Sequence, residues 1–146
     1  MSSLQPNPNH LPWNSYTAAK NRLASDQSTD VMTLDQLGRR GSEAVQIRIA
    51  ENENTSQGTL LFLSKEPSSE VRGAVAQNPN TGSGITEELS RDEDADVRFA
   101  MAENPRTATT LLLLLANDEN SYVSMRAQRT QARLQSECDT ISSRIS

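Results

Sequence analysis

The feature that most constrains the fold of this 146-residue chain is an internal repeat of 26 residues. Shifting the sequence against itself by this period aligns four copies without a gap. Five columns hold one residue type or a close relative: Ala24, Ala50, Ala76, Ala102; Asp26, Asn52, Asn78, Asn104; Thr29, Thr55, Thr81, Thr107; Leu37, Leu63, Leu89, Leu115; and Val45, Val71, Val97, Val123. Such a period is typical of solenoids, in which each unit packs only against its neighbours.

Each repeat carries the signals of two short helices. The first helix is predicted to follow a column of preferred N-cap residues, and the threonine column is predicted to cap the second helix. The first of these columns is Ser42, Ser68, Asp94 and Asn120. We interpret the asparagine column as structural turn capping rather than a ladder of ligands, because asparagine bonds readily to nearby backbone. Helices this short are unstable alone, so stacking must stabilise them.

Two central segments resemble units of the leucine-rich repeat variant family. They read VRGAVAQNPNT from Val71 to Thr81 and VRFAMAENPRT from Val97 to Thr107, and a leucine follows each threonine eight residues later. The resemblance covers about residues 19–128 and implies a right-handed superhelix of helices without strands. The archetype of that family also carries a cysteine cluster that binds an iron–sulphur centre. This cluster is absent here, so the cofactor is not carried over.

The predicted fold is therefore all-α, a right-handed α-solenoid of about four two-helix repeats with a C-terminal capping helix. The expected organisation is a mobile leader over residues 1–14, in which Trp13 covers the first repeat, a repeat domain over 15–128 and an amphipathic helix over 123–146. The repeats span residues 19–44, 45–70, 71–96 and 97–122.

The chemistry of the sequence points away from catalysis. One cysteine and one histidine exclude an internal disulfide, a Cys/His metal site and a histidine-based nucleophilic triad in a rigid setting. We therefore expect no enzyme activity, no cofactor and no metal. The first ten residues lack the pattern of a signal peptide, and the apolar run Leu111–Leu115 is too short to span a membrane. The expected location is cytoplasmic.

Charge is distributed unevenly along the chain. Residues 1–40 carry +1, residues 41–121 carry −8 and residues 122–146 carry +2. An acidic repeat domain disfavours wrapping around a phosphate backbone. Arg72 and Arg98 share one column, but Glu70 and Asp96 lie beside them in the sequence, and we interpret these as solvated pairs.

One apolar column predicts a contact surface. Leu61, Phe62, Leu113 and Leu114 occupy outward positions at which the first and third copies are polar. If all copies share one geometry, these four side chains are exposed and form a candidate partner-binding site. The alternative is that a local rotation of the helix buries some of them.

The C-terminal segment has the pattern of one continuous helix with an apolar seam. The seam consists of Val123, Ala127, Thr130, Leu134, Cys138, Ile141 and Ile145. It is expected to cover the open end of the fourth repeat within a monomer, and the alternative is pairing with the same helix of a second chain.

These observations favour a non-catalytic scaffold that binds another protein. The runner-up hypotheses are an accessory factor of a metalloenzyme system, suggested by the archetype of the family, and a helical-repeat module that binds nucleic acid.

Overall fold

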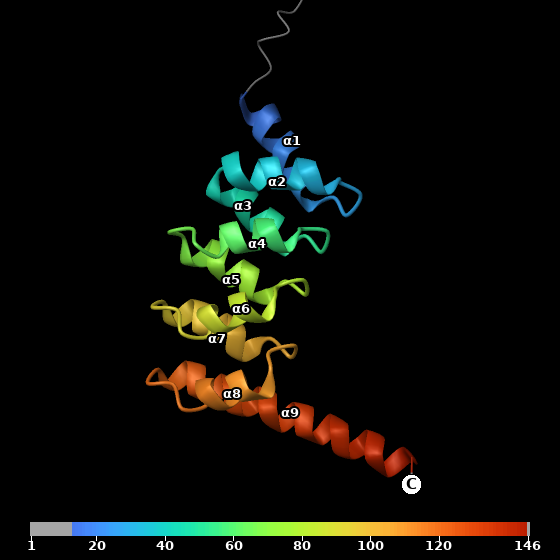
Figure 1. Ribbon diagram of the computed structural model, residues 1–146, viewed down its shortest axis with the longest axis vertical. Coiled ribbons are helices and arrows are strands. Elements are labelled where there is room, and N and C mark those ends of the chain that lie inside the picture. Colours follow the sequence, from blue (N-terminus) through green and yellow to red (C-terminus); the bar gives the residue numbers. More distant parts are fainter. Residues whose placement is uncertain (1–12, 146) are drawn as a thin grey trace, which may run out of the picture.

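The computed structural model describes residues 13–145, which form nine α-helices and no strand (Figure 1). The helices are α1 (Trp13–Ser25), α2 (Val31–Arg40), α3 (Glu43–Glu51), α4 (Gln57–Leu63), α5 (Ser69–Gln77), α6 (Ser83–Leu89), α7 (Ala95–Glu103), α8 (Thr109–Leu115) and α9 (Ser121–Ile145). The all-α helical repeat is thus confirmed, and the right-handed sense stays a prediction. Of the predicted leader, residues 1–12 lie outside the described residues, as does the side chain of Trp13, whose backbone begins α1.

The helices stack in two rows. Helices α1, α3, α5, α7 and the first half of α9 form one row, in which each helix packs against the next. Helices α2, α4, α6 and α8 form the other row, in which α2 packs on α4 but α6 makes almost no contact with α4 or α8. The second row is therefore splayed, and its helices are supported mainly by the first row. The long α9 extends beyond the stack (Figure 1).

The predicted inward columns fill the interior. The valine column is buried in all four copies, as are Leu63, Leu89 and Leu115, whereas Leu37 in the first copy is partly buried. The alanine column is also fully buried in all four copies. Because alanine side chains are small, neighbouring helices of the first row approach closely. The core is therefore closely packed although it holds few aromatic residues.

The asparagine column joins each repeat to the preceding one. The side-chain Nδ2 groups of Asn52, Asn78 and Asn104 donate to the carbonyls of the alanines 28 residues earlier, at 2.9, 2.6 and 2.9 Å. Each Oδ1 accepts from the backbone N–H two residues later. Thr130 in α9 continues the ladder, since its hydroxyl donates to the Ala102 carbonyl at 2.7 Å. The structural role predicted for the asparagine column is confirmed. The asparagines cap a turn and also join neighbouring repeats.

The role predicted for the threonine column is wrong. Each threonine hydroxyl donates to a carbonyl six residues earlier, at 2.6–2.7 Å, and so bonds to the last turn of the preceding helix. The N-caps of α2, α4, α6 and α8 lie one residue further on, at Asp30, Ser56, Gly82 and Ala108. In the other capping column, Ser68, Asp94 and Asn120 accept from backbone N–H groups, whereas the Ser42 side chain does not.

The interpretation of the arginine column as solvated pairs is also wrong. Arg72 makes a bidentate ion pair with Asp92 at 2.8 and 2.9 Å, and Arg98 pairs in the same way with Asp118 at 2.7 and 3.1 Å. All four side chains are only about 8–12% exposed. Each guanidinium also donates to two backbone carbonyls of the loop before its own helix. The pairs therefore tie consecutive loops together across neighbouring repeats.

These ion pairs predict a loss of stability in acid. Hydrogen bonds from Arg98 lower the pKa of Asp118 from its ordinary 3.8. For Asp92, burial raises the pKa, but the hydrogen bonds from Arg72 and the Asp94 N–H outweigh burial, so this pKa is lowered as well. Their contribution is complete above the ordinary value and is lost as the pH falls through the lower folded values.

The urea midpoint should therefore be level from neutral pH to about pH 5 and fall below about pH 4. The double variant Asp92→Asn/Asp118→Asn should start from a lower midpoint and fall less steeply in acid. An equally steep fall in this variant would show that other carboxylates cause the acid loss.

Candidate interaction site

The four residues of the predicted contact surface lie on α4 and α8. Leu61, Leu113 and Leu114 are 50%, 55% and 41% exposed, as expected for outward positions. Phe62 is partly buried against the core, and the Arg39 guanidinium lies 5.0 Å from the centre of its ring. The alternative of local burial thus holds for Phe62.

The candidate residues do not form one patch. Helix α6 lies between α4 and α8 in the stack and presents Glu87 and Glu88 at the equivalent positions (Figure 1). Leu61 and Leu113 therefore belong to two separate surfaces, each with its own neighbours.

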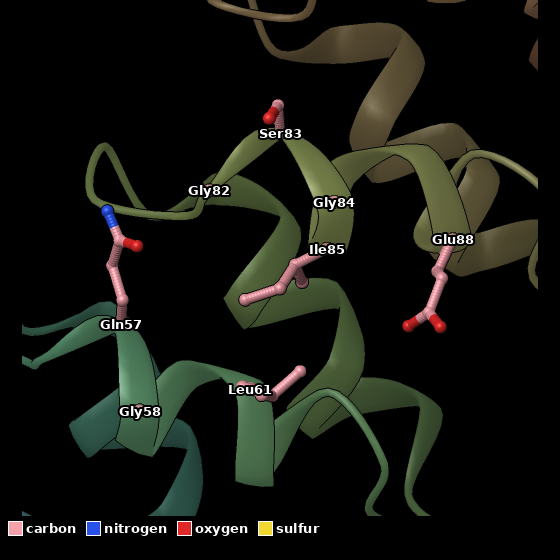
Figure 2. A pocket seen from close by; sticks show the side chains of 8 residues that line it. All are labelled: Gln57, Gly58, Leu61, Gly82, Ser83, Gly84, Ile85 and Glu88. Atoms are coloured by element: carbon pink, nitrogen blue, oxygen red, sulfur yellow. The ribbon is translucent and has the colours of Figure 1, made fainter.

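Leu61 lines a hollow between α4 and α6, which we call the α4–α6 hollow. Its volume is about 520 Å³, and it opens to solvent. Leu61 and the buried Ile85 form its apolar wall, and Gln57 and Glu88 lie toward its two ends (Figure 2). The remaining lining residues are small: Gly58, Gly82, Ser83 and Gly84. The hollow can thus accommodate one apolar side chain between polar ends.

Glycines keep the hollow open. Gly58 and Gly84 are the second residues of α4 and α6, where an alanine side chain would favour the helix. No described glycine has a positive φ, so the backbone does not require glycine at these positions. A Cβ at Gly84 would meet nothing within 4 Å, and one at Gly58 only the Ser56 hydroxyl at 3.8 Å. Neither the backbone conformation nor close packing therefore requires glycine at these two positions.

Glu88, which lines the hollow, and its neighbour Glu87 make ion pairs in solvent. Glu88 pairs with Lys65, and Glu87 pairs with Arg91 at 3.3 Å on the same helix. All four side chains are more than half exposed, so these pairs contribute little to stability. Their carboxylates, the Lys65 ammonium and the Arg91 guanidinium are free to exchange partners when another molecule binds.

Leu113 lines a second surface, a groove between α8 and α9. The groove measures about 480 Å³, and its apolar lining includes Leu112, Leu113, Ala132, Leu134 and Cys138. Leu114 does not line it. Cys138 is an exposed free thiol.

Four residues of the hollow were not predicted as site residues from the sequence: Gln57, Gly58, Gly84 and Ile85. A signal was present, because Gly58 and Gly84 share a column in which the other copies have Met32 and Thr110. The glycine appears only in the second and third copies, whose helices α4 and α6 border the hollow.

The part of the chain that the structure describes holds no group of three or more His, Cys, Asp or Glu side chains that could bind a metal. No described helix is long and apolar enough to cross a membrane. Comparison with family models, curated proteins and solved structures gives no match to this chain.

Proposed function

We propose that this chain is a non-catalytic protein-binding module whose α4–α6 hollow receives an apolar side chain of its partner. The observation that carries the proposal is the pair of helical glycines, Gly58 and Gly84, which cost helix stability and have no backbone reason to be glycine. Leu61 supports it, since an apolar side chain that is 50% exposed beside an open hollow is typical of a contact site.

Charge favours a basic surface on the partner. Residues 41–121 carry −8, and the carboxylate of Glu88 lies at one end of the hollow. A basic protein would be steered toward this surface, whereas a nucleic acid would be repelled. Arg72 and Arg98 cannot bind the phosphates of a nucleic acid, because their guanidinium groups are held in buried pairs with aspartates.

The variant Gly84→Leu tests the proposal. Gly84 lines the hollow and a Cβ there meets no other atom within 4 Å, so a leucine should fill the hollow and partner capture should fall at least tenfold. Because leucine favours helix, the free energy of unfolding should rise by up to about 1 kcal/mol. Capture is measured by cross-linking the full chain in its native cells and quantifying each cross-linked protein by mass spectrometry.

The matched control is Thr110→Leu, the equivalent position on α8, which is exposed and lies outside the hollow. It should capture the same proteins as the unchanged chain. Equal capture by Gly84→Leu and the unchanged chain would contradict the proposal, because the filled hollow would then have no part in binding.

A further inference from the structure

The second half of α9 presents an apolar stripe that no other helix within residues 13–145 covers. Val123, Ala127 and Thr130 are buried against α7 and α8, so the first half covers the end of the stack as predicted. The same face continues through Leu134 and Cys138 to Ile141 and Ile145, which are 59% and 82% exposed. This part of α9 projects from the stack (Figure 1). A single helix of this length is marginal in water, so a covering partner would stabilise it.

The stripe is flanked by two opposite charges. Glu137 and Arg144 lie seven residues apart, which places them on the same side of the stripe, two turns from each other. Glu137 has only a long ion pair with Arg133, at 3.9 Å, and Arg144 makes no ion pair with another residue of 13–145. When two such helices run in opposite directions, Glu137 of each helix can lie opposite Arg144 of the other.

We propose that the second halves of α9 from two copies of this chain pair antiparallel and form a homodimer. In this register Leu134 packs against Ile145 of the second copy, and Cys138 packs against Ile141 of the second copy. The same register places Glu137 opposite Arg144 of the second copy, and two-fold symmetry repeats this pair. The proposal is independent of the α4–α6 hollow.

Geometry favours the antiparallel arrangement over a parallel one. A second helix that ran parallel along the stripe would continue into the space of α8, which already packs on α9. In the antiparallel arrangement, the repeats of the second copy lie beyond the C-terminal end of α9 and do not meet α8. Its Ile145 then reaches the groove in which Leu113 lies beside Leu134. The groove and the stripe thus form one continuous surface for the second copy.

Sedimentation equilibrium of the full chain over a range of concentrations tests the dimer. The mass should rise from the 16.0 kDa of one chain toward twice that value. Ile141→Asp should remain monomeric without lowering the melting temperature of the repeats, because Ile141 is 59% exposed. The control Ser136→Asp, on the opposite face of α9, should dimerise like the unchanged chain. A chain that stays monomeric at the highest concentration, or a dimer that Ile141→Asp does not weaken, overturns the proposal.

A charge exchange tests the orientation. Glu137→Arg and Arg144→Glu should each weaken the dimer about tenfold, and the double variant should restore it, because each single change sets like charges opposite each other. No recovery in the double variant overturns the antiparallel register.

Discussion

Leu89→Asp should lower the free energy of unfolding by about 3–5 kcal/mol, because it places an unpaired carboxylate where the side chain is only 2% exposed. Leu89 is the third member of the buried leucine column and belongs to the apolar core. The energy required to bury the charge adds to the loss of apolar packing. Urea unfolding followed by circular dichroism measures this change.

The matched control is Glu87→Ala, two residues earlier on α6. Glu87 points to solvent and makes only an exposed ion pair with Arg91, so its loss should change the free energy of unfolding by no more than about 0.5 kcal/mol. If the two variants lost the same stability, the assignment of inward and outward faces on α6 would be wrong.

Asp92→Ala should lower the free energy of unfolding by about 3 kcal/mol, because it leaves the buried Arg72 guanidinium without its carboxylate. Glu93→Ala is the control, since this neighbouring side chain is exposed and should contribute little. A double-mutant cycle gives the coupling: Arg72→Met with Asp92→Ala should lose much less than the sum of the two single changes. Losses that simply add would show that the pair does not join the loops.

The sequence was sufficient for the repeat and its interior. Residues such as Val71 and Leu89 recur at one period with one polarity, and burial follows such periodicity directly. The threonine column shows the limit of this reasoning. A threonine at a helix boundary can donate backward to a carbonyl or accept forward from an N–H, and both uses fit the same residue type. Only the backbone shows that Thr81 donates backward, to Val75.

Contacts between repeats were beyond the reach of the sequence. Arg72 has Glu70 close by in the chain, but the stacking of repeats brings Asp92 to it from 20 residues away. The same limit applies to the site. The exposure of Leu61 follows from its column, whereas Phe62 is partly buried against the core and contacts Arg39 of the preceding repeat. The hollow depends on the separation of α4 and α6.

The central structural claim is that the repeats form one continuous stack joined by the asparagine ladder. Hydrogen exchange of the side-chain amides, followed by NMR, tests it most directly. The Nδ2 protons of Asn52, Asn78 and Asn104 are buried in bonds to the preceding repeat, so they should exchange far more slowly than those of the exposed Asn117. Exchange of all four side chains at the same rate would contradict the claim, because the ladder would then be open to water.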